Sequence, residues 1–122
     1  IRDRYADRVE FHDGSGDEIA PGVSLHLLPG HSKGIMGVRV PTKRGWVMLA
    51  GDTSHYWANI RGRNPFPIVV NVEQMLASYK VIESLADGPD HVIPGHDPLI
   101  LKKFPRLNGN PEIVCLHEQP IA

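Results

Sequence analysis

The sequence of 122 residues has one cysteine, no long apolar run and no excess of charge of either sign. The lone Cys115 cannot form a disulfide within the chain, which fits a reducing compartment such as the cytoplasm. No apolar stretch approaches the ~20 residues of a membrane-spanning helix, so no membrane segment is expected. Because the net charge is −1 and basic residues are scattered, no nucleic-acid-binding surface is expected either. The 41% hydrophobic content suffices for one globular domain.

The tripeptide Pro-Gly-His occurs twice, at residues 29–31 and 94–96, and Leu-Ala-Gly-Asp lies between them at residues 49–52. Composition alone predicts roughly 0.06 copies of Pro-Gly-His. Each motif follows a short apolar run, so we expect three strands that end in glycine turns presenting His31, Asp52 and His96. Imidazole and carboxylate groups bind hydrolytic divalent metals. The intervals of 21 and 44 residues are too long for a local zinc finger, so tertiary folding must assemble the site.

Most of the expected elements are strands. We expect strands at residues 8–12, 23–28, 35–40, 46–50, 91–93 and 113–117, and an ordered loop at residues 53–70. The strands at 35–40 and 46–50 flank the segment 41–45 and are expected to form a β-hairpin with a longer loop. This hairpin would return Asp52 to the side of His31.

One long helix is expected from Asn71 to about Ala86. Asn71 is a favourable N-cap, and Gln74 completes a capping-box-like pair. Six apolar residues recur at helical spacing and are expected to face the core: Val72, Met75, Leu76, Tyr79, Ile82 and Leu85. Asp97-Pro98 resembles a second helix start. Strands that alternate with a long helix indicate an α/β or α+β fold.

The segments Gly30-His31-Ser32, Ala50-Gly51-Asp52-Thr53 and Ile93-Pro94-Gly95-His96 resemble the last three metal-ligand motifs of the metallo-β-lactamase superfamily. Their order and intervals are most similar to those of its N-acyl homoserine lactonases. The resemblance, which covers roughly residues 22–100, implies that His31 binds one of two divalent metal ions and His96 the other, while Asp52 bridges both. Zinc is the expected metal, and iron and manganese suit the same mixed ligands.

The other ligands of that family come from an upstream His-x-His-x-Asp-His segment, which this sequence does not contain. We therefore expect residues 1–122 to form the C-terminal half of an αββα sandwich. In such a half, the strands at 35–40 and 46–50 would present an apolar face and an unpaired edge to water. The half would then self-associate, be partly molten, or depend on a partner that supplies the N-terminal half.

The resemblance implies a hydrolase that opens an ester-like bond in a small molecule, foremost an N-acyl homoserine lactone, which is a quorum-quenching activity. Asp52 would also pass a proton to the leaving alkoxide. In these lactonases a tyrosine three residues after the bridging aspartate contacts the substrate carbonyl. Here His55 holds that position and Tyr56 follows it, so either is a candidate hydrogen-bond donor. Four residues could form an acyl-chain wall or only pin the loop to the helix: Trp57, Phe66, Pro67 and Ile68.

Several alternatives remain open at this point. A glyoxalase-II-like thioester hydrolase shares the bridging aspartate, although Lys102-Lys103 is the only basic pair available for glutathione. A diiron flavoprotein would continue into a flavin domain, and the chain could also be an inactive fragment or a partner-completed subunit. A histidine after Pro-Gly could simply hydrogen-bond a turn. Four further histidines are expected to be structural: His12, His26, His91 and His117.

Overall fold

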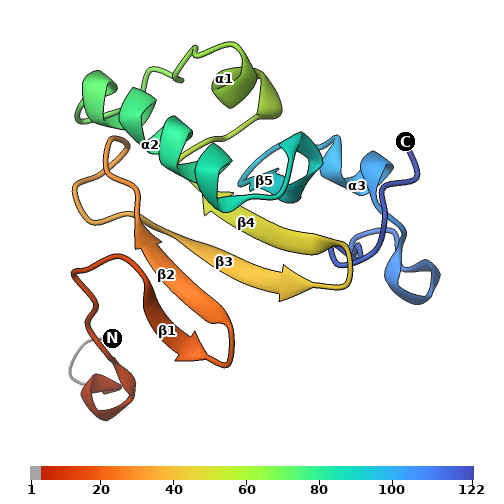
Figure 1. Cartoon of the computed structure of the whole chain (residues 1–122), viewed down its shortest axis with the longest axis horizontal. Coiled ribbons are helices and arrows are strands. Elements are labelled where there is room, and N and C mark those ends of the chain that lie inside the picture. The colour runs from red at the N-terminus through yellow and green to blue at the C-terminus, as the bar shows by residue number, and fades with distance from the viewer. Residues whose placement is uncertain (1–3) are drawn as a thin grey trace.

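The computed structural model describes residues 4–122 and contains one five-stranded sheet with three α-helices (Figure 1). The strands are β1 (Asp17–Ala20), β2 (Val23–Leu27), β3 (Met36–Thr42), β4 (Gly45–Gly51) and β5 (Val92–Pro94). The helices are α1 (Trp57–Arg61), α2 (Val72–Leu85) and α3 (Ile100–Lys103), with 3-10 turns at Ala6–Arg8, Pro89–His91 and Leu107–Gly109. This mixed fold is the expected α/β class. None of the helices within residues 4–122 has the length and hydrophobicity that a membrane span requires.

The strand order β1-β2-β3-β4-β5 explains how distant motifs meet. Neighbouring strands are antiparallel except β4 and β5, which are parallel. Strands β2, β4 and β5 therefore run in the same direction, and their carboxyl ends lie at one edge of the sheet. The chain that leaves β4 returns to β5 through α1 and α2, a crossover connection of the kind that parallel strands require. All three ligand motifs follow strands that end at this edge.

Helix α2 covers one face of the sheet (Figure 1). It begins as expected, because the Asn71 side chain accepts a hydrogen bond from the Gln74 backbone N–H at 2.8 Å. Its apolar side packs with the sheet and the preceding loop in one buried cluster: Leu28, Met48, Ala50, Ile60, Phe66, Met75, Tyr79, Ile82 and Val92. Val72, which the sequence assigned to the same side, is instead exposed. The register of burial therefore begins one turn later than the apolar pattern suggested.

The C-terminal segment covers the opposite face only over β4 and β5. Here the buried residues are Val47, Trp57, Ile93 and Phe104, and Val114 and Leu116 pack against them. The expected strand at 113–117 is wrong, because only Val114 forms a bridge, with Arg106, before the chain turns at Cys115–Glu118. Cys115 is half-buried. The apolar residues of this segment thus pack against the sheet and do not form a strand of it.

Three further expectations differ from the structure. Residues 8–12 form no strand: Arg8 ends a 3-10 turn, and residues 9–12 have no regular secondary structure. The β3–β4 hairpin is tighter than expected, since Thr42 pairs with Gly45 across a two-residue turn. The loop expected at residues 53–70 contains α1, which buries Trp57 and Ile60.

The strands of the hairpin have no free edge. The expectation of an unpaired edge at 35–40 and 46–50 is wrong, because β3 and β4 lie inside the sheet and the edges are β1 and β5. An open apolar face does exist on β2 and β3, on the side opposite α2. The register places Leu25 opposite Val38 and Leu27 opposite Met36, on the same face as Leu49. We call these half-buried residues the open apolar face: Val23, Leu25, Leu27, Met36, Val38 and Val40.

Candidate metal centre

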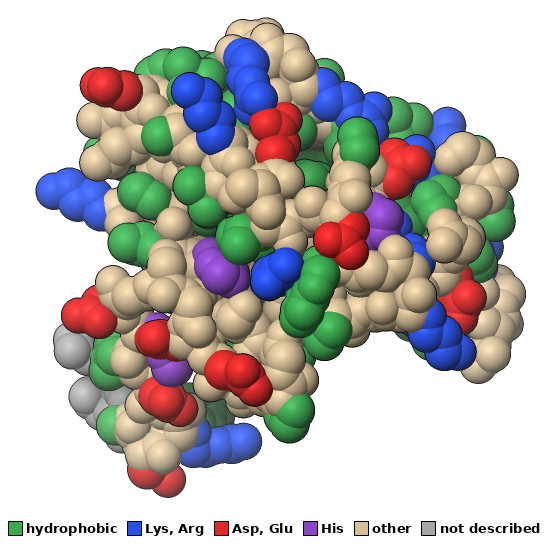
Figure 2. Space-filling model, viewed as in Figure 1, with side chains coloured by type: hydrophobic (Ala, Val, Ile, Leu, Met, Phe, Trp, Pro, Cys, Tyr) green, Lys and Arg blue, Asp and Glu red, His purple; other side chains and the backbone are tan. Residues whose placement is uncertain are grey.

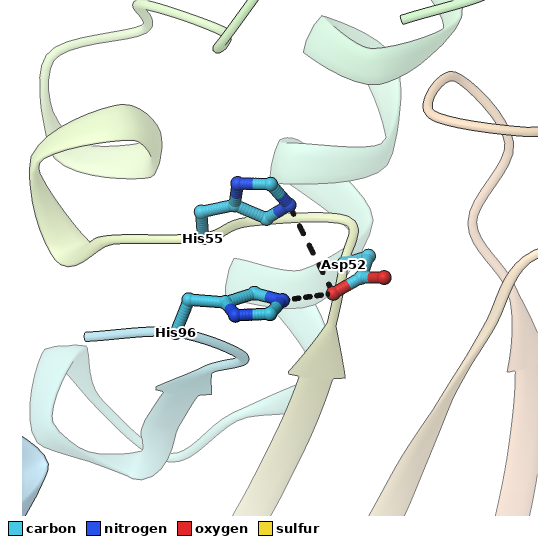
Figure 3. Close-up of side chains that lie close together, drawn as sticks. All are labelled: Asp52, His55 and His96. Atoms are coloured by element: carbon cyan, nitrogen blue, oxygen red, sulfur yellow. Dashed lines mark hydrogen bonds and ion pairs between the residues drawn. The ribbon is translucent and has the colours of Figure 1, made fainter. Parts of the chain in front are cut away.

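The three ligands predicted from the sequence meet at the end of the sheet where strands β2, β4 and β5 terminate. His96 donates from Nε2 to Asp52 Oδ1 at 2.7 Å (Figure 3). His31 Nε2 lies 3.8 Å from the other carboxylate oxygen, Oδ2. The Asp52 side chain is 44% exposed, so the centre is open to solvent on one side. The two oxygens of one carboxylate thus face two different imidazoles, an arrangement that suits a bridging ligand.

The glycines of both Pro-Gly-His motifs are required by close backbone approach. Gly30 has φ +143°, and a Cβ there would lie 2.6 Å from backbone atoms of Met75 in α2. A Cβ on Gly95 would lie 2.7 Å from the carbonyl oxygen of Gly51 at the end of β4. The turn that carries His31 therefore packs directly against α2, and the turn that carries His96 packs directly against the end of β4. The motif therefore recurs because a side chain at either glycine would push a ligand away from the centre.

We expect Gly30→Ala to destabilise the fold by about 2 kcal/mol or more, because it combines a strained positive φ with overpacking against α2. Urea unfolding monitored by circular dichroism measures the difference. Gly34→Ala is the matched control, since a Cβ on Gly34 meets nothing within 4 Å and its φ is not in the left-handed region. Equal stability of the two variants would contradict the close approach at Gly30.

His31 is oriented by the segment before α2. Its Nδ1 donates to the Ile68 carbonyl at 2.7 Å, which leaves the lone pair on Nε2, the nitrogen that faces Asp52. The same segment is tied back to the motif, because the backbone N–H groups of Val70 and Asn71 both donate to the Gly30 carbonyl. This contact could not be predicted from the sequence, because Ile68 acts through its backbone carbonyl.

His55 joins the predicted ligands in the structure. Its Nε2 lies 3.8 Å from Asp52 Oδ1 (Figure 3), and ligand atoms of Asp52, His55 and His96 all lie within 4.8 Å of one another. Phe66 stacks on the imidazole at a centroid distance of 3.5 Å and an angle of 7°. Burial lowers the pKa of His55, and the neighbouring His96 and His31 lower it further, while Asp52 opposes them.

Tyr56 lies beside this cluster and is 45% exposed. Its backbone N–H donates to Asn59 Oδ1 at 2.8 Å at the start of α1. Its ring meets His55 edge-on at 6.4 Å. Tyr56 is thus a neighbour of the cluster and not a member of it.

The four residues considered for an acyl-chain wall divide between packing and exposure. Trp57 is buried and donates from Nε1 to the Val92 carbonyl, so it packs the interior. Phe66 is also buried and supports His55. Pro67 and Ile68 are exposed beside His31. Only the last two are free to meet a ligand.

Asp97 supports the centre in a role that the sequence only partly indicated. One of its carboxylate oxygens accepts from the Leu99 N–H, as the helix-start pattern at Asp97-Pro98 suggested. The other accepts from the Trp57 N–H at 3.0 Å, although the two residues are far apart in sequence. The buried carboxylate therefore links the turn that carries His96 to the first residue of α1.

The other four histidines lie outside the centre. His91 donates from Nε2 to the Arg44 carbonyl, and His26 hydrogen-bonds Ser24. The remaining two pair with nearby acidic residues: His12 with Glu10 and Asp17, and His117 with Glu118. None of the four belongs to the group of converging ligand atoms.

Two mycobacterial proteins are similar to the chain in sequence. No protein-family profile matches the chain. The chain is 31% identical over 105 residues to proteins of Mycobacterium tuberculosis and Mycobacterium bovis that are named probable metallo-hydrolases. This alignment covers 84% of the chain but only 30% of those relatives. The chain thus spans less than a third of their length.

Solved structures with a similar fold include lactone hydrolases. One is an N-acyl homoserine lactone hydrolase with the product N-hexanoyl-L-homoserine bound at its catalytic metal centre, at 29% identity and a TM-score of 0.66. The similarity covers 76% of this chain and 37% of that one. A dizinc quorum-quenching lactonase matches at 17% identity and a TM-score of 0.59, covering 76% of this chain and 32% of its own. The second similarity concerns the fold alone.

Proposed function

We propose that this chain, which belongs to the metallo-β-lactamase superfamily, forms the C-terminal half of a two-metal hydrolase that opens N-acyl homoserine lactones. The observation that carries this proposal is the Asp52 carboxylate, whose two oxygens face His31 and His96 separately. Lactonases at 29–30% identity with the same fold support the substrate class. The curated relatives support the coarser activity, metal-dependent hydrolysis.

The side chains at the centre are of the types that bind a divalent metal ion. His31, Asp52 and His96 offer neutral nitrogen and anionic oxygen donors at an open strand edge, and His31 is held in the tautomer that a ligand needs. We propose zinc, the metal expected from the family resemblance, because imidazole and carboxylate ligands suit it. A bound ion would supply Lewis-acid activation of water and of the lactone carbonyl.

The chain's own residues would handle protons and orient the substrate. Asp52 is half-exposed, so its carboxylate can take a proton during attack and return it to the alkoxide that leaves as the ring opens. Tyr56 is exposed beside the cluster and is a candidate donor to the substrate carbonyl, as is His55. Pro67 and Ile68 offer exposed apolar surface next to His31, where an acyl chain could lie.

The open apolar face supports the half-domain part of the proposal. In an αββα sandwich, the inner faces of the two sheets are apolar and pack together. Here one face of β2 and β3 is apolar and only half-buried, while α2 covers the other face near β4. An upstream half that supplies the remaining metal ligands would cover the open apolar face. Basic and acidic side chains are interspersed on the face shown in Figure 2, so this face offers no continuous basic patch for a macromolecular anion.

The test compares lactone with thioester substrates. A protein that joins this chain to its upstream ligand segment should hydrolyse N-acyl homoserine lactones at about 1 s⁻¹ or faster, while the 122-residue chain alone should be inactive. Preference for a glutathione thioester would favour the glyoxalase-II-like alternative instead. Comparable turnover by the isolated chain would show that the upstream ligands are not needed and would overturn the half-domain proposal.

A further inference from the structure

We propose that His55 is itself a metal ligand, so that Asp52, His55 and His96 form a three-ligand site within this chain alone. This inference rests on the proposed function only in expecting a metal ion at the centre. It assigns His55 a role different from that of the tyrosine that the related lactonases are expected to carry at this position. The choice left open between His55 and Tyr56 is thereby resolved.

The first argument is the convergence of ligand atoms on one oxygen. Asp52 Oδ1 lies 2.7 Å from His96 Nε2 and 3.8 Å from His55 Nε2. Ligands held about 2.0–2.2 Å from a tetrahedral zinc ion are themselves roughly 3–4 Å apart. The two observed separations lie on either side of the middle of this range, so small rotations of the exposed Asp52 and His96 side chains would let the three atoms share one ion. In Figure 3 both imidazoles point a nitrogen at the same carboxylate oxygen.

The second argument is that His55 is held in place by contacts that leave its Nε2 edge available. Phe66 covers one face of the imidazole as a nearly parallel stack, and the His96 ring meets it at 4.5 Å. A stacked ring keeps its orientation at little entropic cost when it binds an ion.

The third argument is the backbone link between the two histidine turns. The His96 N–H donates to the His55 carbonyl at 3.0 Å, and the Gly95 N–H donates to the Ser54 carbonyl at 2.9 Å. These bonds join the loop that follows β4 to the turn that follows β5. They hold the backbones of His55 and His96 side by side independently of any metal.

His31 lies beside the other oxygen of the Asp52 carboxylate. Its Nε2 faces Asp52 Oδ2, and it is not part of the group of three converging ligands. Asp52 would therefore bridge between a site with three ligands from this chain and a site with two. The consequence is an asymmetric centre, in which the first ion binds at His55 and His96, and the donor role toward the substrate falls to Tyr56.

The experiment measures zinc binding to the metal-free 122-residue chain by isothermal titration calorimetry. We expect one ion per chain, and an affinity that falls at least ~10-fold in His55→Phe, as it does in Asp52→Ala and His96→Ala. Phenylalanine keeps the ring that stacks on Phe66 and removes only the nitrogens. His117→Gln, on the exposed C-terminal segment, is the control and should bind like the wild type.

A second measurement needs no variant at the site. In ¹H–¹⁵N spectra of the histidine rings, zinc should shift Nε2 of His55 and His96 together, while the His117 ring is unchanged. Unaltered binding in His55→Phe, or an unshifted His55 Nε2 in the zinc-bound wild type, would overturn the ligand role. If Asp52→Ala and His96→Ala also bind normally, the metal centre itself is absent and the proposed function fails with it.

Discussion

Replacing Asp52 with alanine should lower lactone hydrolysis by the complete enzyme roughly 10³-fold or more. The change removes the proton-transfer group, whose contribution alone is typically 10²–10⁴-fold, and it also removes the carboxylate that faces both His31 and His96. Metal content per chain should fall from two ions toward one. Steady-state kinetics and elemental analysis of the purified variant measure the two effects separately.

Two control variants separate this role from a structural one. Asp52→Asn keeps the size of the side chain but loses the negative charge, so it should bind metal weakly and remain inactive. Glu73→Gln changes an exposed carboxylate in the first turn of α2 and should leave both properties intact. An Asp52→Ala enzyme with normal turnover and two ions per chain would show that Asp52 only forms a turn.

The ligand motifs could be predicted from sequence because their signal is local. An apolar run, a glycine turn and a metal-competent side chain occur together three times, and the structure brings His31, Asp52 and His96 to one edge of the sheet. Helix α2 was predictable for the same reason, since its N-cap and apolar spacing lie within one segment. Both features depend on neighbours in the sequence.

The contacts that orient the site could not be predicted, because they join segments far apart in sequence. The Ile68 carbonyl holds His31, and Phe66 supports His55, although neither residue type marks a metal site. The family resemblance left His55 and Tyr56 open as donors to the substrate carbonyl, and the structure brings a ring nitrogen of His55 within 4.8 Å of ligand atoms of Asp52 and His96. The segment around Val114 looked like a strand, but tertiary packing against Phe104 uses its apolar residues instead. Intrinsic strand preference was outweighed by burial.

The isolated 122-residue chain should self-associate through its open apolar face. Val23, Leu25 and Val38 lie on the side of the sheet opposite α2, and the C-terminal segment covers only the β4–β5 end of that side. A contiguous apolar surface of this kind promotes association in water. Sedimentation velocity should show species larger than a monomer that increase with protein concentration, and hydrogen exchange should be faster in β2 than in α2.

Charged substitutions on the two faces of the sheet give the matched test. Val38→Lys should shift the isolated chain toward monomer, because it places a charge on the open face without disturbing the core under α2. Met48→Lys, on the neighbouring strand but beneath α2, should unfold the chain, since Met48 is fully buried and an unpaired buried charge is strongly unfavourable. In the complete enzyme, Val38→Lys should also become destabilising, because the upstream half would bury the lysine. A wild-type chain that stays monomeric with well-protected β2 and β3 would mean that these residues already bury their own core, and the half-domain proposal would be wrong.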